Sequence, residues 1–249
     1  MKTKKTMPPA ADLFKPNPGK ELAAEADGES YLRLPVKTRL ITEHDDLMAL
    51  LDEYVAPHLL PGDLLFVSEK IVALTQGRIV PIRDVKPTPL ARFLAKHVDN
   101  KRGTPQFRGF GHGTGAGMQL FIEEAGYPRV LLAAAAAAIT RPLGIKGLFY
   151  IISGKNAKSV DCPMSFSLFP YTNYAKLSPR DPGGVAKRVR ERFGCETVIV
   201  DANYRGVYSL GKSDRRITER FIRAVFRDNP AGQSEEMTPF FIVRKEKAA

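Results

Sequence analysis

The sequence predicts an α+β fold, and three observations support this prediction. Short apolar runs of strand character and amphipathic runs of helix character follow one another without a regular βαβ rhythm. The chain contains no internal repeat. Its 249 residues, of which 43% are hydrophobic and 26% charged, are enough for a globular protein with a substantial core. We therefore expect mixed sheets with helices, in one large domain or two interleaved ones.

The two ends of the chain predict basic extensions. Residues 1–30 contain four prolines and two glycines, and their charges follow no helical or strand period. We expect these residues to form a disordered basic arm, residues 31–243 to form the folded domain, and residues 244–249 to form a basic tail.

The first half of the domain alternates strands and helices. Pro35 limits the first strand to an edge or broken strand. Asp45 and Asp46 supply acids at the start of the first helix. The patterns predict a strand over 31–42, a helix over 47–54, a strand over 64–68 that continues into 69–72, a strand over 79–82 and a helix over 90–97.

The second half contains longer apolar runs. The run at 130–139 has about half the ~20 residues that a membrane span needs, so we interpret it as a buried strand or a short helix. The expected elements are a helix over 118–125, core strands over 129–139 and 147–153, a helix over 185–193, a buried strand over 197–200, a helix over 217–226 and a last strand over 240–244.

Asp201, which directly follows the predicted strand 197–200, is the first candidate site residue. Ligand sites in α/β proteins gather where strands end, because side chains there face a crevice. Asp is also a common turn former, so a simple turn is the alternative. Lys70 lies in a polar segment between two predicted strands, where a phosphate contact and a solvated side chain are both reasonable.

Residues 101–117 contain six glycines ahead of a predicted helix. A helix N-terminus can bind phosphate, but no Lys-Ser or Lys-Thr follows, so a mobile loop or lid is the alternative. We expect His112 in this segment to be incidental to catalysis.

The net charge of +11 is concentrated on the predicted tails, because residues 1–20 carry +4 and residues 244–249 carry +2. The remaining +5 suits anionic small ligands such as phosphates and polyglutamates as well as it suits nucleic acid. Two cysteines and four histidines form no zinc spacing. We expect no signal peptide, because no apolar segment follows the lysines near the N-terminus. We therefore expect a cytoplasmic protein without a membrane partner. Nucleic acid is the weakest alternative partner, because no recognition module is found.

Three segments, taken in order, resemble the coenzyme F420-0:L-glutamate ligases, also called F420-0:gamma-glutamyl ligases. The first is Pro61 to Val80, PGDLLFVSEKIVALTQGRIV. The second joins an Asp-Pro-x-Gly helix start at Asp181 to a strand that ends in DANYR from Asp201. The third is the glycine and acid loop over 232–239. The resemblance covers roughly residues 33–243.

The resemblance implies two interleaved subdomains, a homodimer and a GTP-dependent ligase that requires Mg²⁺ or Mn²⁺. The reaction would join L-glutamate through an amide bond to a carboxylate-bearing coenzyme, by way of an acyl phosphate. The implied partners are GTP, L-glutamate and that coenzyme. Position by position, it implies nucleotide contacts at Thr38, Arg39, Leu40, Ile41, Glu69, Lys70, Gly232, Gln233, Ser234 and Glu235, metal ligands at Asp161, Asp201 and Ser234, and catalytic roles for Lys70 and Arg205.

The chain departs from the family pattern at two positions. Leu74 stands where the family has lysine, and Ala202 stands where it has threonine. Lys70, Arg78 or Arg205 are the candidates to replace the lost positive charge. Two alternatives follow: a ligase that acts on a folate or pterin acceptor, and a non-catalytic nucleotide- or ligand-binding protein on the same fold.

Overall fold

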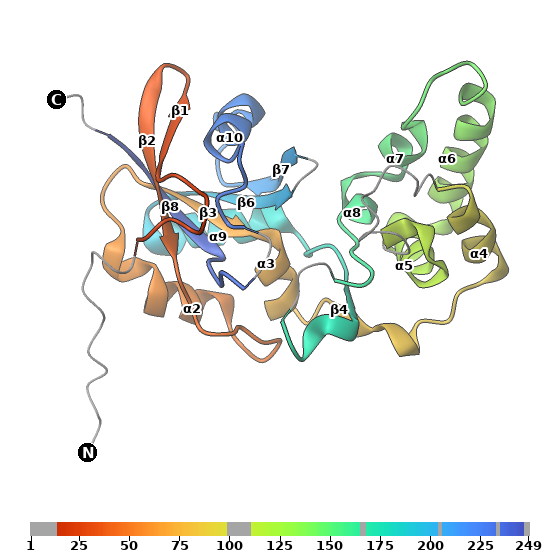
Figure 1. Ribbon diagram of the computed structural model, residues 1–249, viewed down its shortest axis with the longest axis horizontal. Coiled ribbons are helices and arrows are strands. Elements are labelled where there is room, and N and C mark those ends of the chain that lie inside the picture. Colours follow the sequence, from red (N-terminus) through yellow and green to blue (C-terminus); the bar gives the residue numbers. More distant parts are fainter. Residues whose placement is uncertain (1–13, 99–110, 165–167, 204–205, 233–234, 247–249) are drawn as a thin grey trace. The chain divides into compact units, whose positions relative to one another are not determined.

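The computed structural model describes residues 14–98, 111–164, 168–203, 206–232 and 235–246. The chain divides into two compact units (Figure 1). Residues 1–75 and 181–249 form the first, the sheet unit, and residues 76–180 form the second, the helical unit. The helical unit is therefore an insertion in the chain of the sheet unit. Helices and strands occur in both units, which confirms the predicted α+β fold.

The described residues of the sheet unit form a six-stranded mixed sheet. Only β3 and β6 run parallel, and the other paired strands are antiparallel. A bulge interrupts the pairing of β6 with β7. The strand order is β1 (Ala23–Ala26), β2 (Glu29–Val36), β8 (Phe240–Lys245), β3 (Leu64–Ser68), β6 (Glu196–Asn203) and β7 (Gly206–Lys212).

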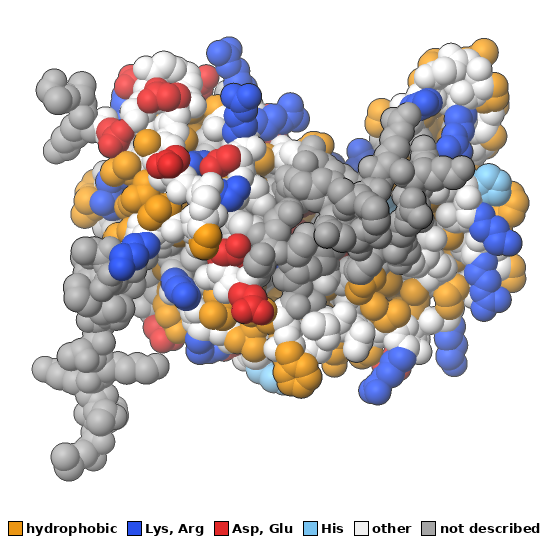
Figure 2. All heavy atoms as spheres, viewed as in Figure 1, with side chains coloured by type: hydrophobic (Ala, Val, Ile, Leu, Met, Phe, Trp, Pro, Cys, Tyr) orange, Lys and Arg blue, Asp and Glu red, His pale blue; other side chains and the backbone are white. Residues whose placement is uncertain are grey.

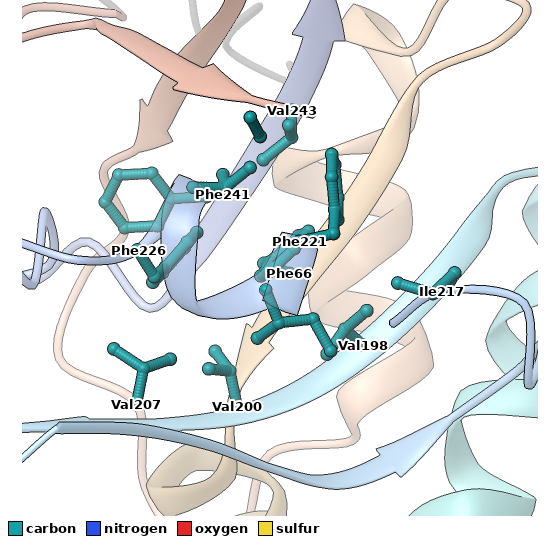
Figure 3. Close-up of a cluster of buried hydrophobic side chains, with 12 residues drawn as sticks. Phe66, Val198, Val200, Val207, Ile217, Phe221, Phe226, Phe241 and Val243 are labelled. Carbon is teal, nitrogen blue, oxygen red and sulfur yellow. The ribbon is translucent and has the colours of Figure 1, made fainter. Parts of the chain in front are cut away.

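An apolar cluster fills the space between one face of this sheet and α10 (Glu219–Val225), as Figure 3 shows. Strand alternation directs Val198 and Val200 of β6 to this face. The rings of Phe66 and Phe226 stack with centroids 4.6 Å apart, and Phe241 meets Phe226 edge-on at 5.3 Å. Because these side chains come from distant parts of the chain, the cluster fixes the order of the central strands.

The helix α9 (Pro182–Phe193) packs against β6 and β7 from the other face. Its N-cap is Asp181, whose carboxylate accepts a hydrogen bond from the Gly184 amide at 3.0 Å. The start of α9 lies so close to β7 that a Cβ at Gly211 would be 2.2 Å from the Pro182 carbonyl carbon. Two shorter helices of this unit are α2 (Leu47–Tyr54) and α3 (Glu69–Thr75).

The helical unit contains a two-stranded sheet and a group of short helices. Its core gathers Met118, Phe121 and Ile122 of α5 with apolar side chains of the neighbouring helices. The elements are β4 (Ile79–Pro81), α4 (Pro89–Lys96), α5 (Gly115–Ala125), α6 (Tyr127–Thr140), α7 (Leu148–Ser153), α8 (Lys155–Lys158) and β5 (Tyr174–Lys176). None of the described helices is long and apolar enough to cross a membrane.

Three segments predicted as strands are helical. The predicted core strands 129–139 and 147–153 are α6 and α7, and the predicted extension over 69–72 belongs to α3. For the run 130–139, the alternative of a short helix agrees with the structure. An apolar run does not by itself separate a strand from a helix, and the alanines of 133–138 have the highest helix propensity. Only Val130 and Ala133 of α6 are buried, so α6 is also less buried than predicted.

The predicted boundaries of both tails are too wide. Residues 14–30 include β1, and the Asn17 amide donates to the Pro230 carbonyl and the Thr238 hydroxyl at 2.7 Å each. Residues 1–13 lie outside the described residues. At the other end, Arg244 and Lys245 belong to β8. The Arg244 guanidinium is paired with Asp63, with 2.8 Å between Nη2 and Oδ2.

Charge is divided unevenly between the two units. The helical unit has 15 Lys and Arg against 5 Asp and Glu, a net charge of +10. The sheet unit, which includes both tails, has 23 against 22, a net charge of +1. The net charge of +5 outside the tails is therefore the sum of two unlike parts. The helical unit is strongly basic, and the sheet unit without its tails is acidic.

Candidate functional site

Three strands of the sheet unit end or begin at one edge of the sheet. Val36 of β2 lies beside Phe240 of β8, and Phe240 lies beside Val67 of β3. The parallel pair of β3 and β6 then places Ser68 beside Val200. The carboxyl ends of β2 and β3 and the amino end of β8 therefore share an edge with the second half of β6.

The predicted site residues of the sheet unit fall on this edge. Residues 38–41 follow β2, Glu69 and Lys70 follow β3, residues 232–239 precede β8, and Asp201 lies in β6. Strand pairing thus brings together four segments that are distant in sequence. Three further predicted residues lie outside the described part of the chain: Arg205, Gln233 and Ser234.

The first segment, residues 38–41, is hydrogen-bonded to the loop before β8. The Thr38 amide donates to the Met237 carbonyl at 2.9 Å, and the Thr38 side chain is buried. Ile41 is buried as well, whereas Arg39 and Leu40 are exposed. Of the four predicted nucleotide contacts here, Arg39 and Leu40 offer side chains to a ligand, and the other two support the segment.

Asp45 holds this segment in shape. Its carboxylate pairs with the Arg39 guanidinium and accepts from the Thr42 amide at 2.7 Å and the Thr42 hydroxyl at 3.0 Å. The hydrogen bond from Arg39 is the main reason why the pKa of Asp45 lies far below its usual range. The same bond raises the pKa of Arg39. The loop therefore presents a fixed cation beside the sheet edge.

Glu69 and Lys70 form the first turn of α3, which begins directly after β3. The Glu69 side chain is buried, and Lys70 is half-buried. Val72 and Ala73 are fully buried and follow at helical spacing, which explains why the chain turns into a helix here. One carboxylate and one ammonium group are thereby positioned on a rigid element at the sheet edge.

Asp201 lies within β6, not beyond its end as predicted. It is in register with Tyr208 of β7, and the strand continues to Asn203. Strand alternation places Asp201 on the face opposite to Val200 and the apolar cluster. The Asp201 side chain is half-buried, so a carboxylate lies on the sheet and does not open a turn.

The loop before β8 is shaped by glycine and asparagine. Gly232 has a φ of 73°, and a Cβ there would lie 2.3 Å from the Glu236 carboxyl carbon. The Asn229 amide donates to the Gly232 carbonyl at 3.1 Å, while its buried Oδ1 accepts no hydrogen bond from the residues that the structure describes. Glu235 is exposed. The loop thus brings two carboxylates to the region ahead of β8.

Of the residues considered as substitutes for the missing lysine, Arg78 is excluded by its contacts. Its guanidinium pairs with Glu124 and donates to the Ser178 carbonyl at 3.0 Å, both within the helical unit. Leu74 is buried in α3, and Ala202 packs against the apolar cluster of the sheet. Among the described residues, Lys70 is the candidate that remains at the sheet edge.

Asp161 lies in the helical unit. Its backbone forms an isolated bridge with Lys176, with hydrogen bonds of 3.0 and 2.8 Å. Its Oδ2 is 3.9 Å from the fully buried Lys176 ammonium, which also donates to the Ser159 carbonyl at 2.6 Å. A cation at Asp161 would compete with this ammonium for the carboxylate. The metal-binding role of Asp161 stays a prediction.

The described part of the glycine-rich segment is structural. The Gly117 amide is capped by the Thr114 hydroxyl at 3.0 Å, and a Cβ at Gly117 would lie 2.2 Å from the Gly111 carbonyl oxygen. The His112 ring meets the Phe121 ring edge-on, with centroids 4.7 Å apart. These glycines therefore permit close packing. Residues 101–110 of the segment lie outside the described residues.

The donor set at the sheet edge suits a hard cation that is bound together with phosphate. Among the described residues, no three His, Cys, Asp or Glu side chains gather into a metal cluster. Mg²⁺ commonly uses one or two carboxylates and takes its remaining ligands from water and substrate phosphates. Asp201 lies within β6, and Glu69 directly follows the neighbouring parallel strand β3; both are carboxylates of the kind that such a site requires.

Two residues of structural importance could not be identified from the sequence. The sequence pattern predicts Asp45 as an acid at the start of α2, but Asp46 is the N-cap and Asp45 organises residues 39–42. Lys176 is fully buried, although lysine is rarely buried and no pattern signalled it. Cys162 and Cys195 are free thiols whose burial raises their pKa values, so neither is an activated nucleophile.

Comparison with known proteins supports the resemblance. The model of the F420-0:Gamma-glutamyl ligase family matches residues 35–218. The match includes residues 38–41, α3, Asp161 and Asp201, and it ends before the loop 232–239 and β8. No curated protein gave a match to the chain. Because the family model covers well over half of the residues, the chain belongs to the F420-0:gamma-glutamyl ligase family, a family of ligases.

Proposed function

We propose that this protein is a GTP- and divalent-metal-dependent ligase that adds L-glutamate to a carboxylate-bearing coenzyme. The observation that carries the proposal is the meeting of residues 38–41, Glu69, Lys70 and Asp201 at one edge of the sheet. These residues supply cations for phosphate and carboxylates for a metal. The family match supports the amide-forming chemistry and the F420-0 acceptor.

The residues at the sheet edge have distinct roles in this proposal. Asp201 and Glu69 hold the cation through carboxylate oxygens, and Lys70 contacts the phosphates as a point charge. Arg39 is held in place by Asp45 and exposes a second cation beside them. A bound Mg²⁺ or Mn²⁺ supplies charge neutralisation during phosphoryl transfer. The buried Thr38 and Ile41 keep the segment in register.

The reaction is chemically balanced with GTP as the co-substrate. A carboxylate oxygen of the acceptor attacks the γ-phosphorus, the bond to the β-phosphate oxygen breaks, and GDP leaves. The glutamate amine then attacks the acyl carbon of the acyl phosphate. Inorganic phosphate leaves, and the amine loses one proton as the amide forms. The chain's task is positioning and electrostatic stabilisation at the phosphates.

The test is an amide-forming assay with the purified full chain. L-glutamate labelled with ¹⁴C is incubated with GTP, Mn²⁺ or Mg²⁺, and either F420-0 or a folate as acceptor. We expect label in a product one glutamate heavier than F420-0, with GDP formed in equal amount and a loss of at least ~100-fold in Asp201→Asn. If only the folate product is labelled, the acceptor is a folate and not F420-0, while the proposed amide-forming reaction stands.

A second candidate is a nucleotide-binding protein that has lost catalysis. The burial of Leu74 and the engagement of Arg78 by Glu124 favour it, because neither residue supplies the charge of the family lysine. This candidate predicts metal-dependent GTP binding without product from either acceptor. Absence of nucleotide binding would contradict both candidates.

A further inference from the structure

The segment from α6 to α8 exposes an unusual amount of aliphatic surface. In α6 only Val130 and Ala133 are buried. Large aliphatic side chains are rarely left open to water in such number over so short a stretch. Within residues 127–160, six of them are more than half exposed: Leu131, Leu132, Ile139, Leu143, Ile145 and Ile151.

These side chains form a continuous face on α6. At 100° per residue, the exposed positions 131, 132, 135, 138 and 139 cover an arc of about 120°, and each is Leu, Ile or Ala. Arg129 is the only charged residue of the helix and lies about 60° outside this arc. The exposed turn 141–147 extends the apolar face beyond the end of α6.

The same segment carries positive charges that no acidic residue within it balances. Residues 127–160 contain no Asp or Glu, and their five cations are all exposed: Arg129, Arg141, Lys146, Lys155 and Lys158. In the turn, Leu143 and Ile145 lie between Arg141 and Lys146. Figure 2 shows hydrophobic and Lys or Arg side chains together on the helical unit. The helical unit as a whole has a net charge of +10.

We propose that α6 and the turn 141–147 dock on an anionic lipid bilayer, with α6 lying in the plane of the interface. Its 14 residues are about 21 Å long, so α6 lies on a bilayer and does not span it. Leu and Ile would enter the boundary between headgroups and acyl chains. The exposed cations would contact lipid phosphates, each contributing to binding near a negatively charged surface.

Charge complementarity favours lipid over other occupants. A second copy docked through the same face would bring two groups of five cations together, which like-charge repulsion opposes. Interface hot spots between proteins favour Trp, Tyr and Arg, whereas this face consists of Leu, Ile and Ala. Nucleic acid would leave the aliphatic side chains without a partner.

The test measures binding of the full chain to vesicles by sedimentation, with phosphatidylcholine alone or with 30% phosphatidylglycerol. We expect binding to the anionic vesicles that falls as salt rises. The double variant Ile139→Ser/Leu143→Ser should lose at least ~tenfold in partitioning. Arg141→Gln/Lys146→Gln should lose about tenfold. The matched controls in the sheet unit, Leu60→Ser and Lys187→Gln, should change binding less than about twofold.

Three results would overturn the proposal. The first is absence of binding to either vesicle. The second is unchanged vesicle binding of Ile139→Ser/Leu143→Ser. Binding would then depend on positive charge alone, to which the lysines of residues 1–20 also contribute. The third is a dimer or a nucleic-acid complex that the aliphatic variant disrupts while vesicle binding stays absent. Circular dichroism of each variant controls for folding. None of these results bears on the ligase proposal.

Discussion

The sheet unit and the helical unit use their charged residues differently. In the sheet unit, Arg244 pairs with the nearly fully buried Asp63, and the buried Arg33 pairs with Asp228. Lys and Arg are nearly balanced by Asp and Glu, 23 to 22. In the helical unit they outnumber Asp and Glu by 15 to 5. Most of its cations therefore have no carboxylate of the same unit to pair with.

This difference indicates two kinds of function. These ion pairs link distant segments at the end of the strands opposite to the site, so they stabilise the sheet that carries the site for phosphate and metal. The open cations and aliphatic side chains of the helical unit suit contact with a large anionic surface. Four predictions, and then one decisive measurement, test this division.

The largest expected effect is on the core of the sheet unit. Phe66→Ala removes a fully buried ring that stacks on Phe226 and should cost about 4 kcal/mol of unfolding free energy. The matched variant in the helical unit is Phe121→Ala, whose ring is equally buried. In native-state hydrogen exchange, Phe66→Ala should lower amide protection in residues 14–75 and 181–246. Phe121→Ala should lower amide protection in residues 76–180. Equal spread of both losses over the chain would contradict two separate units.

The second effect concerns the buried ion pair. Arg244→Met leaves the Asp63 carboxylate without its partner and should cost about 3 kcal/mol in urea unfolding. The control is Arg192→Met, which breaks an exposed pair with Asp52 and should cost less than about 1 kcal/mol. If both variants lose the same free energy of unfolding, the burial of the Arg244–Asp63 pair does not account for its contribution to the stability of the sheet unit.

The two units also differed in how well the sequence predicted them. Strands 64–68 and 240–244 and the helix at 185–193 were predicted, because alternation and caps mark them locally. The helix α7 was predicted as a strand, and α6 as a strand or a short helix, because a short apolar run lacks a distinguishing period. The hairpin partner β7 was not predicted at all.

The candidate site was predicted as separate segments and not as an arrangement. Glu69 and Asp201 were identified by resemblance, but only the register of β3 with β6 shows that Glu69, directly after β3, and Asp201, within β6, belong to neighbouring strands. The role of Asp45 depends on a loop that closes back on Arg39 and Thr42, which no local pattern reports. Lys176 is buried by tertiary packing alone.

A third, smaller effect is expected at Lys70. Lys70→Met keeps the length of the side chain and removes its charge, so GTP affinity should fall about tenfold. Melting temperature should stay nearly constant, because Lys70 is only half-buried. Lys37→Met, at an exposed position just after β2, is the control and should bind GTP like the wild type. Equal affinity of all three proteins would remove Lys70 from the site.

The smallest effect is the pH dependence of the loop 38–45. Asp45 has a lowered pKa in the folded state, so its contribution to stability is complete above its unfolded pKa of roughly 4. That contribution should be lost as the pH falls from about 4 towards the lower folded pKa. The difference in melting temperature between wild type and Asp45→Asn should therefore shrink below about pH 4. A difference that stays constant down to pH 2.5 would contradict the assigned pair with Arg39.

The central claim is that the sheet edge binds a nucleotide together with a metal. Isothermal titration of GTP, with and without Mg²⁺ or Mn²⁺, tests it on wild type, Asp201→Asn and Asp161→Asn. The account predicts metal-dependent binding in the wild type and its loss in Asp201→Asn, with circular dichroism unchanged. Asp161→Asn tests separately whether the Asp161 carboxylate of the helical unit contributes to this metal-dependent binding. Equal GTP binding by wild type and Asp201→Asn, or binding by neither, would contradict the account.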